Sequence, residues 1–302
     1  MTNPFQKATL KQAKLRLGIT GPSGSGKTLA ALMIAKGIGG NVAVIDTEHG
    51  SASLYSRSFD FDVINLDPPY SPERFIELLK AAESGGYGVV IIDSATHEWD
   101  GIGGCLEINE ALAQAKFRGN TWSAWNETTP RHRAFIDAII QSPCHVICTA
   151  RSKTETVQGE DKKVRKVGMK TEQRAGFEYD MSLIFEIEHE KHLAVLTKGR
   201  LFDAPASVRN ALGTPHLITP KTGELLMEWL STGEIAPAAT PGTTTSGTTE
   251  INWESEAIRL KDRLKVLDVN IARDLWSKHL GKWQDMAVSM QSEVDRITAA
   301  AQ

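Results

Sequence analysis

A glycine-rich segment near the start of the chain carries the clearest chemical signal. It follows the pattern G-x-x-x-x-G-K-[ST] of a phosphate-binding P-loop, and its residues are Gly21, Pro22, Ser23, Gly24, Ser25, Gly26, Lys27 and Thr28. Glycines let successive backbone N–H groups turn toward one anion, and a following helix adds its positive dipole end. Lys27 would face the β- and γ-phosphates, and the Thr28 hydroxyl would ligate Mg²⁺. The segment therefore predicts a nucleoside triphosphate site with Mg²⁺.

The surrounding segments place this loop between a strand and a helix. Apolar runs predict strands at 15–20, 42–46, 63–66, 89–93 and 145–149, and they alternate with predicted helices at 27–36, 72–84, 106–115 and 130–141. Short apolar strands separated by helices predict an α/β fold, with a mainly parallel sheet covered on both faces. Residues 180–188 and 192–198 predict antiparallel strands at the end of this sheet.

The composition divides the chain into four segments. We expect an N-terminal arm over 1–14, an α/β core over 15–231, a flexible linker over 232–249 and a small helical domain over 250–302. The linker consists almost entirely of Gly, Ala, Pro, Thr and Ser, which cannot bury a core.

Charge and cysteine content restrict the partners and the cellular compartment that we expect. The net charge of −3 provides no global basic field, so contact with nucleic acid requires a local basic patch. Three cysteines fit a reducing cytoplasm, and we interpret Cys144 and Cys148 as buried thiols on one face of a strand. No stretch approaches ~18 apolar residues, so we expect a cytoplasmic protein without a membrane partner.

Hydrolysis requires acidic groups beside the phosphates. Asp93 ends the predicted strand 89–93, where a Walker B carboxylate would meet Mg²⁺. Two carboxylates are candidates for the group that activates water: Glu98, which follows Asp93 by five residues, and Glu48, at the end of the strand after the P-loop helix. The chemistry of the residues alone does not choose between them.

A family resemblance favours Glu48. The sequence Val-Ile-Asp-Thr-Glu-His over 44–49, followed by Tyr55 seven residues after Glu48, resembles the RecA-like recombinases. The resemblance extends over about 15–205 and is strongest to the short RecA-like ATPases of phages, which act as single-strand-annealing recombinases. It implies a RecA-like P-loop ATPase core that binds ATP, with Glu48 as the catalytic base and Tyr55 stacked on adenine.

The same resemblance implies assembly. Lys198 and Arg200 are similar to a basic pair that reaches the ATP of a neighbouring subunit, like an arginine finger in trans. A homo-oligomer, either a ring or a filament, is therefore expected, and Phe5 with Ala8 matches a short F-x-x-A assembly motif. The family's usual Gln after the strand 145–149 is replaced by Arg151, a candidate γ-phosphate sensor. Members of the family often carry an acidic residue that contacts adenine. The corresponding position in this chain lies near Ala52, which leaves the base specificity open.

A basic segment follows Arg151. Residues 151–174 contain eight basic and four acidic residues, a net charge of +4, without helical or strand periodicity. We expect a mobile loop that binds single-stranded DNA phosphates, because its position matches the family's second DNA-binding loop. The candidate contacts are Lys153, Lys162, Lys163, Arg165, Lys166, Lys170 and Arg174.

The resemblance, together with the basic segment, implies a DNA-stimulated ATPase that promotes homologous pairing or annealing in phage recombination and repair. The alternatives are a helicase or helicase loader in replication, and an adaptor that binds nucleotide without hydrolysing it. Single-strand-binding protein or replication proteins are further candidate partners. Tryptophans 122 and 125 are interpreted as packing residues next to a helix that begins at Pro130.

Overall fold

The computed structural model describes residues 13–158, 164–174, 176–199 and 201–231, together with positions 289 and 292, and side chains are described outside 154–170. The chain divides into two compact units, Met1–Ala238 and Ala239–Gln302, and the fold below belongs to the first. The predicted linker, nearly all of the predicted helical domain and the assembly motif at Phe5 lie outside the described residues.

Parallel strands form the centre of a sheet, as the sequence predicts. The strand order is β3-β2-β4-β5-β1-β7-β8-β9, in which neighbours from β3 to β7 run parallel and β8 and β9 are antiparallel. The strands are β1 (Arg16–Gly21), β2 (Val42–Asp46), β3 (Asp62–Asn65), β4 (Val89–Asp93), β5 (His145–Gln158), β7 (Leu183–Ile187), β8 (Leu193–Gly199) and β9 (His216–Leu217). The predicted α/β fold class, with antiparallel strands at its end, is confirmed.

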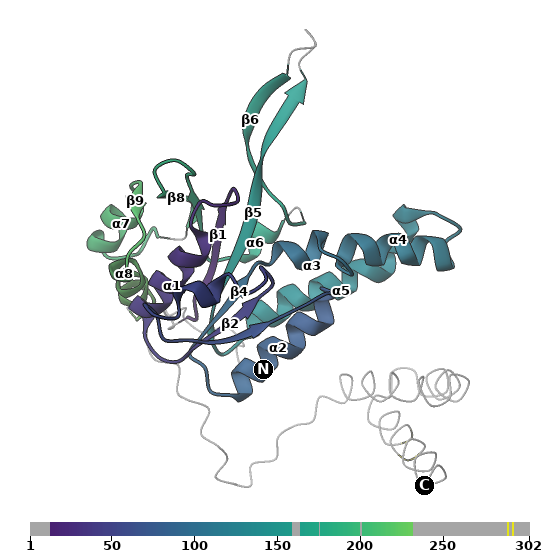
Figure 1. Cartoon of the computed structure of the whole chain (residues 1–302), viewed down its shortest axis with the longest axis horizontal. Coiled ribbons are helices and arrows are strands. Elements are labelled where there is room, and N and C mark those ends of the chain that lie inside the picture. The colour runs from purple at the N-terminus through teal and green to yellow at the C-terminus, as the bar shows by residue number, and fades with distance from the viewer. Residues whose placement is uncertain are drawn as a thin grey trace, which may run out of the picture. The chain divides into compact units, whose positions relative to one another are not determined.

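Helices cover both faces of this sheet (Figure 1). Helices α1 (Lys27–Ile38), α7 (Ala206–Leu212) and α8 (Pro220–Ser231) enclose one hydrophobic cluster, and α2 (Pro72–Ser84), α5 (Thr121–Gln141) and α6 (Phe177–Asp180) enclose the other. Alternate residues of one strand enter opposite clusters, because strand side chains point to opposite faces. Val42 and Val44 face α1, whereas Ala43 and Ile45 face α2. Helices in the described ranges are all too short or too polar to traverse a bilayer.

The basic segment is a β-ribbon, which corrects the prediction of a loop. Strand β5 continues to Gln158 and pairs antiparallel with β6 (Val164–Thr171), so that Lys153 lies opposite Lys170. Figure 1 shows this ribbon extending away from the sheet. The Val and Thr residues of this segment carry a strand preference, but they do not alternate with polar residues in the strict pattern by which a half-buried strand is recognised.

Helix α5 begins nine residues earlier than predicted, and Pro130 lies inside it. Asn120 caps the helix, and its side-chain oxygen accepts a hydrogen bond from Ser123 N at 3.1 Å. Capping satisfies one of the free N–H groups of the first turn, so the helix starts well before the proline. Helix α4 (Cys105–Lys116) packs along the N-terminal part of α5, and the short α3 (Thr96–Asp100) connects β4 to this pair.

Candidate nucleotide-binding site

The P-loop joins β1 to α1 with a tightly packed backbone. Gly26 precedes the helix with φ of 91°, a left-handed conformation that favours glycine. A side chain at Gly21 would bring its Cβ within 2.6 Å of Ser25 Oγ and 2.9 Å of the Ile187 carbonyl oxygen. Gly21 therefore occupies a position where a larger residue would clash, whereas Gly24 and Gly26 are favoured by their left-handed backbone conformation.

Donor groups gather inside this turn. Lys27 Nζ donates to the carbonyl oxygens of Gly21 at 3.0 Å and Pro22 at 2.8 Å. Burial lowers the pKa of Lys27, while Asp93 and Glu48 act in the opposite direction. Ser25 Oγ is buried without a hydrogen-bond partner among the described atoms. A buried ammonium and an unpartnered hydroxyl beside a helix N-terminus fit a phosphate group, which accepts hydrogen bonds from both.

Asp93 lies next to Thr28, as a Mg²⁺ site would require. Its Oδ2 accepts a hydrogen bond from Thr28 Oγ1 at 2.6 Å, and its Oδ1 accepts one from the Thr149 hydroxyl. Burial raises the pKa of Asp93, and these two hydrogen bonds partly oppose that effect. A carboxylate and a hydroxyl are the oxygen ligands that Mg²⁺ prefers. Strand β5 lies between β4 and β1 in the sheet, and its Thr149 contacts Asp93 at the end of β4.

Glu48 forms a bidentate ion pair with Arg151 at the same edge of the sheet. Arg151 Nη2 lies 2.8 Å from Oε1 and 2.7 Å from Oε2 of Glu48, and Arg151 Nε lies 3.1 Å from Oε1. The hydrogen bonds that Arg151 donates to Glu48 raise the pKa of Arg151. Asp46 holds the turn that carries Glu48, because its carboxylate accepts from Glu48 N at 2.6 Å and Ala52 N at 2.9 Å.

Glu98, the alternative candidate for the base, lies in a different environment. Its side chain is fully buried, accepts a hydrogen bond from Cys105 Sγ at 3.1 Å and lies 3.1 Å from His132 Nδ1. Gln173 Nε2 lies 3.4 Å from the same carboxylate. Glu98 thus joins α3, α4 and α5, whereas Glu48 is partly exposed and close enough to influence the pKa of Lys27.

The other sequence candidates are dispersed. Tyr55 ends a 3₁₀ turn, η1 (Ala52–Tyr55), and packs partly buried against the cluster beside α1. Lys198 Nζ donates to the carbonyl oxygens of Glu178, Tyr179 and Met181, at 2.6 to 2.7 Å. These carbonyls lie around the end of α6 rather than at the P-loop, and Arg200 lies outside the described residues. The role of this basic pair in a neighbouring subunit stays a prediction.

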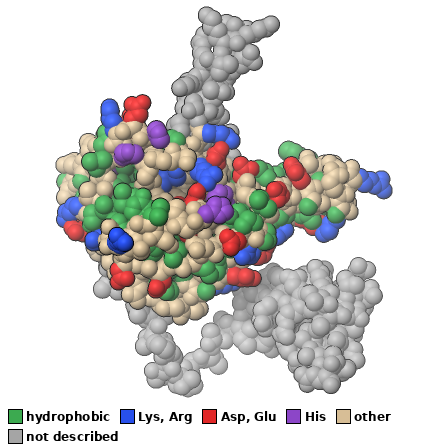
Figure 2. Space-filling model, viewed as in Figure 1, with side chains coloured by type: hydrophobic (Ala, Val, Ile, Leu, Met, Phe, Trp, Pro, Cys, Tyr) green, Lys and Arg blue, Asp and Glu red, His purple; other side chains and the backbone are tan. Residues whose placement is uncertain are grey.

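The candidate DNA contacts belong to the ribbon and its base. Lys153 Nζ pairs with Glu172 at 3.1 Å, and Arg174 follows the end of β6 by three residues. The backbone places Arg165, Lys166 and Lys170 on β6, while Lys162 and Lys163 lie outside the described residues. In the space-filling view, cationic, acidic and histidine side chains gather near the foot of the ribbon (Figure 2).

Sequence reasoning missed the contact between the β7–β8 turn and the P-loop. His192 Nδ1 lies 3.0 Å from the Ser25 carbonyl oxygen, and a Cβ on Gly24 would lie 3.5 Å from His189 Cε1. This proximity follows from the parallel pairing of β1 with β7. No local pattern signals it, because the two segments are more than 160 residues apart.

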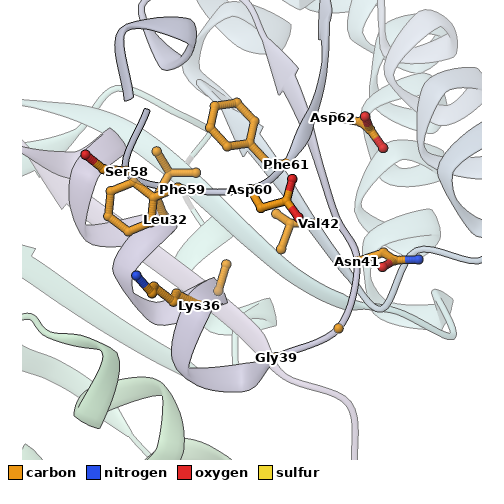
Figure 3. Close-up of a pocket in the computed structure, with 12 residues that line it drawn as sticks. Leu32, Lys36, Gly39, Asn41, Val42, Ser58, Phe59, Asp60, Phe61 and Asp62 are labelled. Carbon is orange, nitrogen blue, oxygen red and sulfur yellow. The ribbon is translucent and has the colours of Figure 1, made fainter. Parts of the chain in front are cut away.

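A cavity of about 370 Å³ lies at the other end of α1. Figure 3 shows the side chains that line it, among them Leu32 and Lys36 of α1 and Phe59 and Phe61 of the segment before β3. Lys36 Nζ lies 5.4 Å from the Phe59 ring centroid. Its lining contains none of the P-loop residues, Asp93 or Glu48. This cavity therefore does not include the residues predicted to bind phosphate.

Comparison with known proteins agrees with this geometry. A family model described as an AAA domain matches residues 13–214. Protein RecA of Phytoplasma mali (strain AT) is 36% identical over 110 residues, which cover 33% of this chain and 32% of that protein. Protein RecA of Ruminococcus albus is 39% identical over 82 residues, which cover 25% of this chain and 21% of that protein. Protein RecA of Acholeplasma laidlawii is 35% identical over 82 residues, which cover 25% of each.

The chain spans from about a fifth to a third of the length of these relatives, so the similarity concerns part of each protein. The family match, in contrast, covers most of the described fold. The chain belongs to the AAA domain family, and its core is that of a RecA-like P-loop ATPase.

Proposed function

We propose that this protein hydrolyses ATP with Mg²⁺ and uses the reaction to control its binding of single-stranded DNA, as an annealing or pairing protein of the phage recombinase type. The observation that carries the proposal is the course of β5. Its residues touch Asp93 through Thr149 and Glu48 through Arg151, and the same strand continues into the basic ribbon.

The side chains at the sheet edge have complementary tasks in this proposal. Lys27 and the P-loop N–H groups would bind the phosphates, and Thr28 with Asp93 would hold Mg²⁺, which would neutralise charge on the phosphate oxygens. Glu48 orients the attacking water and accepts its proton. Arg151 fixes the Glu48 carboxylate through two parallel hydrogen bonds, from Nε to Oε1 and from Nη2 to Oε2, a geometry that lysine cannot reproduce.

Coupling to DNA follows from the shared strand. A change in the position of Glu48 on ATP binding would move Arg151, whose backbone N–H donates to Thr96 Oγ1 at 2.8 Å at the foot of the ribbon. Lys153 follows two residues later. Phosphate contacts along the ribbon would give affinity without base sequence preference.

Assembly would complete the site. Lys198 and Arg200 would stabilise the γ-phosphate of the adjacent subunit, in a ring or filament on DNA. The similarity to proteins named RecA supports this arrangement.

The test is the rate of ATP hydrolysis with and without single-stranded DNA over a series of salt concentrations. We expect DNA to stimulate hydrolysis at low salt, the stimulation to decline steeply as salt rises, and removal of Mg²⁺ to abolish turnover. Equal rates with and without DNA at every salt concentration would contradict the coupling. ATP binding without hydrolysis would favour the adaptor, and strand separation would favour the helicase.

A further inference from the structure

A pocket lined by three tryptophans also includes Arg174, which follows strand β6 of the ribbon by three residues. Trp99 comes from α3, and Trp122 and Trp125 come from the first turns of α5. The remaining lining residues are Asn126, Thr129, Pro130 and Arg174, and the cavity has a volume of about 530 Å³. This volume lies within the ~300–1,000 Å³ that is typical of small-ligand pockets.

Two of these indoles form the fixed wall of the pocket. Trp99 and Trp125 stack with ring centroids 5.5 Å apart and an interplanar angle of 15°. The Arg174 guanidinium carbon lies 5.9 Å from the Trp99 centroid and 5.5 Å from the Trp125 centroid. Arg174 Nη2 also donates to Thr129 Oγ1 at 3.0 Å, so cation–π contacts and a hydrogen bond hold the arginine in place.

Trp122 is the unusual member. Its relative exposure is 85%, so its indole contributes little to the hydrophobic core of the monomer. A large aromatic side chain left in water beside a cavity is more informative than a scattered exposed aliphatic residue, because aromatic anchors dominate binding surfaces. The prediction that Trp122 is a packing residue is therefore wrong, whereas Trp125 does pack against Trp99.

The position of the pocket connects it to the ribbon. Gln173 Nε2 donates to the Ala95 carbonyl oxygen at 2.9 Å, which anchors the chain leaving β6 to the start of α3. The next residue is Arg174, which lies over the indoles. A strand of nucleic acid lying along the basic ribbon would reach this pocket at the ribbon's base.

The charge of the lining selects the type of ligand. It contains one cation, Arg174, and no carboxylate among its described residues. A cationic ligand would be repelled by Arg174, which already occupies two aromatic faces. A flat, uncharged ring attached to an anionic backbone is complementary to this arrangement, because the ring can stack on indole while its phosphates approach the arginine.

We propose that the Trp99–Trp122–Trp125 pocket receives one unstacked base of single-stranded DNA, with Trp122 as the stacking surface. This inference rests on the proposed binding of single-stranded DNA and adds a base contact to the phosphate contacts of the ribbon. The basic segment itself contains no aromatic residue from 151 to 174, so the fold supplies the stacking surface from α3 and α5.

The test compares binding of full-length protein to oligothymidylate and to an abasic phosphodiester oligomer of the same length, at equal salt. Wild type should bind oligothymidylate more tightly, and Trp122→Ala should lose about 5- to 100-fold in affinity for it without losing affinity for the abasic oligomer. Trp122→Phe should recover part of the loss. Leu217→Ala removes another exposed hydrophobic side chain, on β9, and should leave both affinities unchanged.

The outcomes separate this inference from the proposed function. Equal affinity of wild type for the two oligomers would overturn base stacking while leaving phosphate binding intact. An unchanged affinity of Trp122→Ala for oligothymidylate would also overturn it. If wild type binds neither oligomer at low salt, both the pocket inference and the DNA-binding function fail. The slope of binding against salt should be the same for Trp122→Ala and wild type, since indole contributes no ion pair.

Discussion

Glu48 and Glu98 are both carboxylates that follow buried strands, yet their surroundings differ completely. Glu48 is held at an accessible edge by the guanidinium of Arg151, and Glu98 is enclosed by Cys105, His132 and Gln173. A residue that activates water needs access to solvent and to the phosphates. The geometry therefore supports Glu48 as the base and a structural task for Glu98.

Exchanging each carboxylate for its amide tests this distinction. Glu48→Gln should reduce the turnover number for ATP by about 10²- to 10⁴-fold while ATP still binds, because an amide cannot accept a proton. Glu98→Gln is the matched control and should retain turnover under conditions where it remains folded. The measurements are steady-state hydrolysis and equilibrium nucleotide binding. Full turnover by Glu48→Gln would remove it from the catalytic role.

Arg151 is expected to affect the reaction more than the stability. The ion pair is partly exposed, so Arg151→Ala should change the free energy of unfolding by less than about 1 kcal/mol. Turnover should fall at least about tenfold, since Glu48 would lose its orientation, while KM for ATP changes little. Arg151→Lys should restore little activity because ammonium cannot form the paired hydrogen bonds. A fall in melting temperature that accounts for the lost activity would contradict a positioning role.

Helix α5 shows how an element can serve both the core and the surface. Its C-terminal half buries Phe135 and Ile139 against the sheet, and its N-terminal half projects with α4 and carries Trp122. The start of the projecting half depends on the cap at Asn120. The presentation of the tryptophan pocket is therefore linked to local helix stability.

Removal of the cap tests this link. Asn120→Ala should lower stability by about 1 kcal/mol, because it leaves the Ser123 N–H without its side-chain acceptor. Asn120→Asp, which keeps an oxygen at the same position, should retain most of the stability. Urea denaturation of both variants gives the comparison. Equal destabilisation by Ala and Asp would show that the hydrogen bond is not the cause.

For the molecule as a whole, acid stability is expected to depend on His145. This residue is buried beside the sheet, and Leu15 N donates to its Nδ1 at 3.1 Å. Burial, with smaller contributions from Lys14 and Arg16, lowers the pKa of His145 from 6.5 to about 4. Between these values the unfolded chain binds the proton and the folded chain does not, so stability falls as pH decreases through this window.

His145 should contribute about 3 kcal/mol to the free energy of unfolding at neutral pH, and this contribution should be lost between about pH 6.5 and pH 4. His145→Asn places an amide oxygen near the position of Nδ1 and does not titrate, so the variant should lose less stability than wild type over this range. Free energies of unfolding at several pH values measure the difference. Parallel pH profiles for the two proteins would exclude His145 as the cause.

The sequence alone determined the P-loop, the strand that ends at Asp93 and the parallel α/β core. These features depend on neighbouring residues: glycines in a tight turn, apolar runs of strand length and helix formers between them. Cys144 and Cys148 were likewise correctly expected as buried thiols, since both enter the cluster beneath α5, although only Cys148 lies on β5 and Cys144 directly precedes it. Local spacing was sufficient because each signal lies within one element or one turn.

Only the tertiary structure decided which distant groups meet. The pairing of Glu48 with Arg151 spans 103 residues, and the tryptophan pocket brings α3, α5 and the end of the ribbon together. The strand order β4-β5-β1 and the packing of α5 create these contacts, and neither is encoded in any local pattern. The physical reason is that burial of the two hydrophobic clusters selects the arrangement of elements, and the polar groups at their ends then meet as a consequence.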